Sequence, residues 1–127
     1  MGFKLERKKT KISPYILIDE DKSYIRIEGE SYLEDILMFF REINEWLERY
    51  LASDFTELTF DCEMYFFNSS TTKQLYNMFS RIDENAIGKR VVINWIVPDK
   101  NDEIMISCGE DFRDIFENCE FNIIIAN

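Results

Sequence analysis

The longest alternation of apolar and polar residues runs from Glu57 to Phe66. Side chains of a strand point in turn to its two faces, so this pattern predicts a strand with one buried face and one wet face. Its apolar positions are Leu58, Phe60, Cys62, Met64 and Phe66. A strand covered on both faces reads instead as a continuous apolar run, and we therefore expect helices mainly on one face of the sheet.

Four shorter segments also have the pattern of strands. Residues 15–18 and 24–28 flank a polar turn, and we expect them to pair as a hairpin. The segment 90–97 ends at Pro98, and its density of apolar residues is typical of a strand inside a sheet. Residues 121–125 predict a final strand.

Three segments repeat apolar residues at steps of three and four, which predicts helices that each bury one face. The first helix is expected over 32–51, and Ser31 is suited to cap its start. The second begins at Ser69 or Ser70. The third spans 102–117 and contains a glycine, which costs about 1 kcal/mol relative to alanine or allows close packing.

The predicted order is β-β-α-β-α-β-α-β, a hairpin followed by alternating units. This order indicates an α/β domain in which strands are joined by right-handed helical crossovers. No glycine-rich phosphate loop follows any of the strands, which disfavours the nucleotide-binding versions of this architecture.

Composition and charge narrow the classes of function. At 127 residues, with 46% hydrophobic and 15% aromatic residues, the chain is suited to one well-packed domain. Its formal net charge of -10 argues against a nucleic-acid binder and favours a basic protein partner. We interpret residues 1–11 as a flexible basic tail and residues 12–127 as the domain. The basic residues of this tail are Lys4, Arg7, Lys8, Lys9 and Lys11.

The residues of common catalytic and metal sites are sparse. The chain has no histidine, so the commonest general base and zinc ligand is missing. Cys62, Cys108 and Cys119 are widely spaced and odd in number, which is typical of reduced core thiols. Asp61 and Glu63 share the wet face, and we interpret them as solvated carboxylates. We therefore predict no catalytic residue, no metal and no cofactor.

The sequence also bears on location in the cell. No apolar run approaches the ~20 residues that a membrane-spanning helix needs. The start of the chain lacks the apolar core of a signal peptide. We therefore expect a cytoplasmic protein that does not insert into membranes.

Four hydroxyl residues, Ser69, Ser70, Thr71 and Thr72, lie where the longest strand is expected to stop and the second helix to start. The free N–H groups of a helix start attract anions. A serine or threonine at this place is most simply a cap. Four in succession are more than one cap requires, so the run is also a candidate phosphorylation site.

Five phrases of the sequence, taken in order, carry a family resemblance. They are Pro14-Tyr15, Ile27-Glu28-Gly29-Glu30-Ser31-Tyr32, the Phe39-Phe40 to Trp46-Leu47 helix, Tyr65-Phe66-Phe67-Asn68-Ser69-Ser70-Thr71-Thr72-Lys73 and Val92-Ile93-Asn94-Trp95. In their order and spacing, from about residue 12 to the end, the chain resembles the SiaC family of bacterial regulatory phosphoproteins. That family has a fold similar to STAS domains, so the resemblance implies a single STAS-like α/β domain with a mixed sheet.

The resemblance implies a non-catalytic partner switch. A serine/threonine kinase of the histidine-kinase-like type would phosphorylate the protein, and a PP2C-type phosphatase would remove the phosphate. The dephosphorylated form would engage an output protein, for which the resemblance implies a diguanylate cyclase. The pathway would then act on cyclic di-GMP and on biofilm formation or aggregation.

The family motif also implies the modified residue. The phosphate acceptor follows the asparagine of the motif and is typically threonine, whereas Ser69 occupies that position here. Ser70 and Thr71 stand directly beside it and remain alternatives. The partner-binding surface that we expect around the acceptor consists of Phe67, Asn68, Ser70, Thr72 and Lys73.

Three other functions remain open from the residues. In a constitutive interaction domain, the hydroxyl run would only cap the helix. In a STAS-like sensor, the domain would carry a small ligand, although the sequence has no binding signature for one. A small enzyme would require a deep polar pocket around Asp61 or Glu63.

Overall fold

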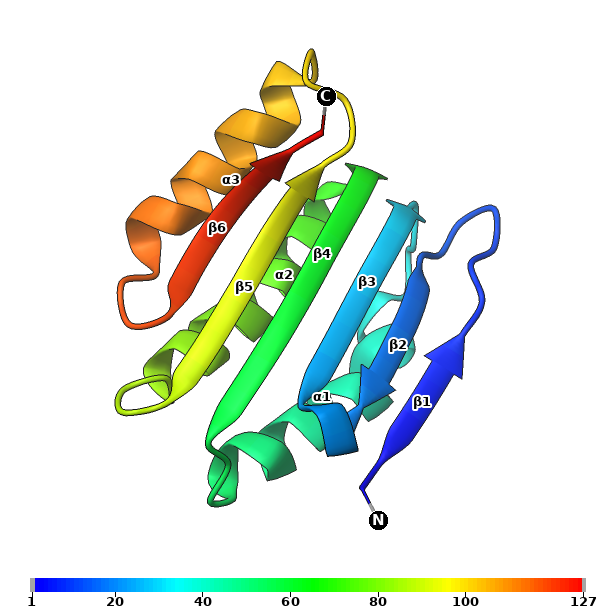
Figure 1. Ribbon diagram of the computed structural model, residues 1–127. Helices are drawn as coiled ribbons and strands as arrows, with labels where there is room; N and C mark the ends of the chain where they lie inside the picture. Colours follow the sequence, from blue (N-terminus) through cyan, green and yellow to red (C-terminus); the bar gives the residue numbers. More distant parts are fainter. Residues whose placement is uncertain (1, 127) are drawn as a thin grey trace.

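The computed structural model describes residues 2–126, which form one six-stranded sheet and three α-helices (Figure 1). The strands are β1 (Lys4–Arg7), β2 (Tyr15–Asp19), β3 (Tyr24–Ser31), β4 (Glu57–Phe67), β5 (Arg90–Val97) and β6 (Glu120–Ile125). The helices are α1 (Ile36–Ala52), α2 (Ser69–Glu84) and α3 (Glu103–Ile115), with the 3-10 helix η1 (Glu20–Lys22) between β2 and β3. The predicted α/β domain is confirmed.

The strands lie in the sheet in the order in which they occur along the chain. β2 is antiparallel to β1 and to β3, whereas β3, β4, β5 and β6 are parallel to one another, so the sheet is mixed. Each crossover steps in the same direction across the sheet. Right-handed crossovers of this kind place their helices on one face, and Figure 1 shows α1, α2 and α3 on the same side.

The predicted tail differs from the structure at residues 4–7, which form β1 and pair with β2. Leu5 packs against the hydrophobic core. The Arg7 guanidinium donates to the Phe39 carbonyl at 2.7 Å and to the Glu42 carboxylate at 2.8 Å, so the strand is tied to α1. Three of the four residues of β1 are charged, and this composition hides the strand in the sequence.

The first helix begins later than predicted. Ser31 is the last residue of β3 rather than a helix cap, and α1 starts at Ile36. The cap is Asp35, whose carboxylate accepts from the N–H of Met38 at 3.2 Å. The predicted helix cap at Ser31 is therefore wrong, and the Ser31 hydroxyl pairs instead with the Thr71 hydroxyl of α2.

An aromatic cluster fastens α2 and α3 to the sheet. The Phe79 ring of α2 meets Phe60 of β4 and Phe112 of α3 edge to face, with centroids 5.3 Å apart in each case. Trp95 of β5 lies 6.3 Å from the same ring. Such contacts are worth about 0.5–1.5 kcal/mol beyond the burial of the rings. The position of α2, and with it the position of its first turn, is therefore fixed by the core.

Gly109 lets α3 approach β5 closely. A Cβ atom at this position would lie 2.4 Å from Cδ1 of Trp95, which is closer than packed atoms allow. On the same helix, the Met105 carbonyl accepts from Nε1 of Trp95 at 2.9 Å. The prediction that this glycine allows close packing is therefore confirmed.

The face of the sheet without helices carries a polar network. Arg26 of β3 donates from Nη2 to Oε1 of Glu63 at 2.8 Å and lies 3.6 Å from Oδ2 of Asp61. Tyr24 and Asn94 each donate to the Asp61 carboxylate, at 2.6 and 2.8 Å. The two acidic side chains are only 20% and 18% exposed. They are paired and half-buried, which corrects their interpretation as solvated carboxylates.

Candidate functional site

The first turn of α2 is built around Asn68, which is the cap of the helix. Its Oδ1 accepts from the N–H of Thr71 at 3.1 Å and from the Thr71 hydroxyl at 2.8 Å. Its Nδ2 donates to the Leu33 carbonyl at 2.9 Å, which ties the helix to the segment between β3 and α1. The predicted joint between strand and helix is confirmed, and the cap is the asparagine before the hydroxyl run.

The four hydroxyl residues have four different surroundings. Ser69 is exposed and Ser70 is half-buried. Thr71 is fully buried, and its Oγ1 lies 2.7 Å from the hydroxyl of Ser31. Thr72 is half-buried and donates to the Asn68 carbonyl at 3.2 Å. A reagent or an enzyme in solvent therefore reaches the hydroxyl of Ser69 more readily than the hydroxyl of Thr71.

A bulge in β4 changes which side chains the joint displays. Met64 pairs with Gly29, but the next residue of β3, Glu30, pairs with Phe66, so one residue of β4 is extra. The alternation is thereby reversed. Phe66, which the sequence assigned to the buried face, is 45% exposed. Phe67 is half-buried, and its ring lies edge to face with Trp95 at a centroid distance of 5.9 Å.

Exposed apolar side chains lie at the same edge of the sheet as the first turn of α2. The Tyr32 ring stacks on Phe66, with centroids 4.9 Å apart. Leu37 and Met38 in the first turn of α1 are 72% and 68% exposed, and Ile104 in the first turn of α3 is 84% exposed. Parallel strands followed by helices bring these first turns to one edge, where ligands and partners commonly bind. We call these five residues the apolar edge.

A cavity of about 450 Å³ separates the first turn of α2 from α3. It is lined by Tyr65, Phe66, Phe67, Thr72, Asp102, Ile104, Met105 and Cys108. Burial, and then the nearby Asp111, raise the pKa of the Cys108 thiol to about 11, so this thiol is not an activated nucleophile. The cavity adds an apolar recess to the apolar edge rather than a catalytic group.

The predicted partner-binding residues are not all on the surface. Asn68 and Phe67 are half-buried and structural, as the cap and as a contact of Trp95. Lys73 is exposed and lies one turn after Ser69 on the helix. Whether these residues contact a partner stays a prediction.

Sequence reasoning missed Ser31 and the apolar edge. Ser31 was assigned to a helix start, although it continues the alternation of its strand into a buried position. Exposed apolar residues at helix starts have no periodic signal of their own. They become visible only when the sheet order brings three first turns together.

The described residues limit the other classes of site. Within residues 2–126, no group of three or more Cys, Asp or Glu side chains could hold a metal ion. No helix in this range is both long and apolar enough to cross a membrane. The three cysteines are free in this structure; Cys62 and Cys119 are buried, as expected of core thiols, whereas Cys108 is half-buried.

Comparisons with known proteins point in one direction. The chain matches a family model described as SiaC family regulatory phosphoprotein over residues 7–126. An uncharacterised protein of Pseudomonas aeruginosa strain UCBPP-PA14 is 28% identical over 117 residues, which are 91% of this chain and 90% of that protein.

Two solved structures are similar over nearly the whole chain. One is the crystal structure of the diguanylate cyclase SiaD in complex with its activator SiaC from Pseudomonas aeruginosa, with a TM-score of 0.83 and 26% identity, covering 95% of this chain and 97% of that chain. The other is SiaC of Pseudomonas aeruginosa, with a TM-score of 0.83, 25% identity and 98% of each chain covered.

Proposed function

Because the chain belongs to the SiaC family of regulatory phosphoproteins, we propose that it is a cytoplasmic, non-catalytic phospho-switch. A histidine-kinase-like serine/threonine kinase phosphorylates it, and a PP2C-type phosphatase reverses the reaction. The dephosphorylated form binds and activates a diguanylate cyclase. The complex of SiaD with its activator SiaC, in a structure to which this chain is similar, supports the choice of output protein.

The observation that carries the proposal is the exposure of Ser69 in the first turn of α2. It is the first helical residue after the Asn68 cap, and its hydroxyl has no hydrogen-bond partner among residues 2–126. A kinase can therefore reach it without opening the helix. Thr71, in contrast, is fully buried, which disfavours it as the acceptor.

A phosphate on Ser69 suits the helix that carries it. The group adds about -1.5 to -2 charges at pH 7 and faces the positive end of the helix dipole. Lys73 lies four residues later, on the same side of the helix, and can pair with it. The modified protein should stay folded, so the phosphate acts on binding rather than on stability.

The same phosphate conflicts with a partner that covers the apolar edge. A partner that removes Phe66 and the other exposed side chains of that edge from water is bound more tightly, because the burial of apolar surface is favourable. A dianion beside them would have to lose its water shell in the complex, which is costly unless the partner supplies matching arginines. We therefore expect the cyclase to dock over the apolar edge and to leave on phosphorylation.

Phosphorylation by the cognate kinase tests the acceptor. We expect Ser69→Ala to abolish incorporation of phosphate, and Ser70→Ala, the matched control, to retain it. Mass spectrometry of the intact protein and of its peptides measures both. Undiminished labelling of Ser69→Ala would overturn the acceptor, and the absence of phosphate from residues 69–72 of the native chain would overturn the switch.

Calorimetric titration with the cyclase tests the consequence. We expect Ser69→Glu to weaken binding at least about tenfold. The control is Asn77→Glu, which makes the same change of charge at an exposed position two turns along α2. Equal affinities of Ser69→Glu and the native chain would favour a constitutive interaction domain instead. A loss of affinity in Phe66→Ala as well would support docking over the apolar edge.

A further inference from the structure

The basic cluster near the start of the chain has no role in the proposed switch. Two of its members are neutralised within the fold. Lys4 lies 3.5 and 3.8 Å from carboxylates of η1 and β2, and Arg7 is paired with a carboxylate of α1. Lys8, Lys9 and Lys11 have no carboxylate within 4.0 Å among residues 2–126. Three free cations in one loop are unusual in a chain with a net charge of -10.

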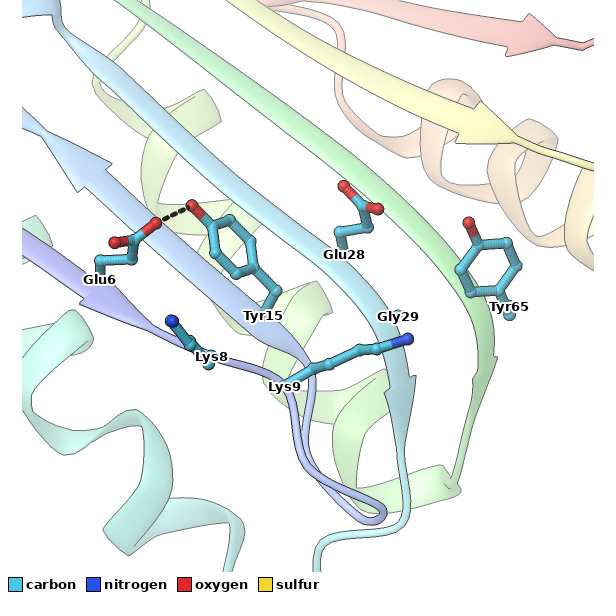
Figure 2. Close-up of a pocket in the computed structure, with 7 residues that line it drawn as sticks. All are labelled: Glu6, Lys8, Lys9, Tyr15, Glu28, Gly29 and Tyr65. Atoms are coloured by element: carbon cyan, nitrogen blue, oxygen red, sulfur yellow. Dashed lines mark hydrogen bonds between the residues drawn. The ribbon is translucent and has the colours of Figure 1, made fainter.

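Lys8 and Lys9 border a hollow on the helix-free face of the sheet (Figure 2). The hollow has a volume of about 570 Å³, within the range of small-molecule sites. It is lined by Glu6, Lys8, Lys9, Tyr15, Glu28, Gly29 and Tyr65. It lies at the bulge, where β4 has one residue more than β3, and bulges are frequent beside binding sites.

A second hollow extends the first toward the end of β3. Its volume is about 450 Å³. It shares Lys9, Gly29 and Tyr65 with the first hollow and adds Lys11 to the lining. In Figure 2 the Lys9 side chain extends toward Gly29, so its ammonium lies where the two hollows meet. The free cations are thus spread along one continuous recess.

The carboxylates of the first hollow are already occupied. Oε2 of Glu6 accepts from the Tyr15 hydroxyl at 2.6 Å. Oε1 of Glu28 accepts from Nε of Arg26 at 2.9 Å. These bonds use the acidic groups within the protein, whereas the ammonium groups remain available. The carboxylates keep their negative charge, so the positive charge that the first hollow offers to a ligand is confined to the ammonium groups of Lys8 and Lys9, which make no ion pair among residues 2–126.

The two tyrosines offer their rings rather than their hydroxyls. The Tyr15 hydroxyl donates to Glu6, and the Tyr65 hydroxyl donates to Glu63 at 3.1 Å. In Figure 2 the Tyr15 and Tyr65 rings stand on either side of Glu28, with the side chains of Lys8 and Lys9 below them in this view. An aromatic face beside a free cation suits a ligand that has a planar ring and a negative charge.

We propose that this recess is a binding site for a small aromatic anion, such as an aryl phosphate. The negative group contacts the ammonium groups of Lys8 and Lys9, and the ring lies against Tyr15 and Tyr65. The recess does not include the phosphate acceptor, although Tyr65 also lines the cavity beside the first turn of α2, and its test needs neither the kinase nor the cyclase.

Titrations with three probes test this site, and the shifts of the backbone amides in nuclear magnetic resonance spectra measure binding. Phenyl phosphate has both the ring and the charge, inorganic phosphate has the charge alone, and phenol has the ring alone. We expect phenyl phosphate to bind with a dissociation constant of about 1 mM or below, and each partial probe at least about tenfold more weakly. The shifts should centre on residues 8–11, 15, 28–30 and 65.

Two pairs of lysine variants distinguish binding in the recess from non-specific attraction of an anion to lysines. We expect Lys8→Gln with Lys9→Gln to weaken phenyl phosphate binding at least about tenfold. The control, Lys22→Gln with Lys100→Gln, removes the same charge from exposed positions outside the recess and should change binding less than about twofold. Tyr65→Leu should reduce the affinity for phenyl phosphate toward that for inorganic phosphate.

Three results would overturn the proposal. One is the absence of phenyl phosphate binding at tens of millimolar. Another is equal binding of phenyl phosphate and inorganic phosphate. The third is an equal loss of affinity in the lysine pair of the recess and in the control pair.

Discussion

Replacement of Asn68 by alanine would test how the first turn of α2 is held. The amide side chain makes three hydrogen bonds in the structure. Its oxygen accepts from the N–H of Thr71 at 3.1 Å and from the Thr71 hydroxyl at 2.8 Å, and its nitrogen donates to the Leu33 carbonyl at 2.9 Å. The variant removes all three and leaves the Thr71 hydroxyl with Ser31 as its partner.

These contacts set the size of the effect on the free energy of unfolding. Loss of a helix cap costs about 1 kcal/mol. The Leu33 carbonyl, left without its donor, adds about 1 kcal/mol. We therefore expect Asn68→Ala to destabilise the protein by about 2 kcal/mol, which lowers the melting temperature by about 8 °C in a domain of this length.

Urea unfolding followed by tryptophan fluorescence measures this change. Asn68→Asp keeps the acceptor and loses only the donor to Leu33, so we expect about half the effect. Asn77→Ala is the control, because Asn77 is exposed on the same helix and should change stability by less than about 0.5 kcal/mol. If Asn68→Ala were as stable as this control, the role of the cap in holding α2 would be refuted.

Three further predictions concern packing, thiol reactivity and pH. Gly109→Ala should destabilise the protein by about 1–2 kcal/mol in urea unfolding, because its methyl group would lie 2.4 Å from Trp95; a more stable variant would contradict this. Iodoacetamide should label half-buried Cys108 before fully buried Cys62, as peptide mass spectrometry would show, and the reverse order would be evidence against the packing of β4. Burial, and then a hydrogen bond to the Asp61 carboxylate, raise the pKa of Tyr24, so the fold favours the neutral phenol. This contribution to the free energy of unfolding is fully present below the ordinary pKa of 10.0 and is lost as the pH rises through the folded pKa. Tyr24→Phe should therefore lose less stability than the native chain above pH 10.0, and an unchanged alkaline slope would exclude this linkage.

Long, strongly patterned elements were predictable from the sequence. The alternation of β4 identifies its buried face up to Met64, and the helical spacing after it predicts a start of α2 at Ser69 or Ser70, which agrees with the observed start at Ser69. The alternation misleads at Phe66, because a bulge inserts one residue and reverses the faces. The pairing partner that creates the bulge lies on β3 and is distant in the sequence.

The short strand β1 was not predicted, because tertiary contacts rather than its own sequence pattern order it. β1 has a single apolar residue packed on the core, Leu5, and its other residues are charged. Pairing with β2 and the bonds of Arg7 to α1 order it. A strand of four residues without its own apolar pattern therefore reads as a tail until its neighbours are known.

The sequence shows four hydroxyl residues in a row, but only the packing of α2 shows which of them are exposed. Successive helical residues turn by about 100°, so four hydroxyls in a row point in four directions. Once Asn68 is known to be the cap, Thr71 falls on the covered side and meets Ser31 at 2.7 Å. A phosphate there would break buried bonds and place a dianion out of water, at a cost of several kcal/mol. On Ser69 the same group faces solvent beside free N–H groups, so packing favours Ser69 without appeal to the family motif.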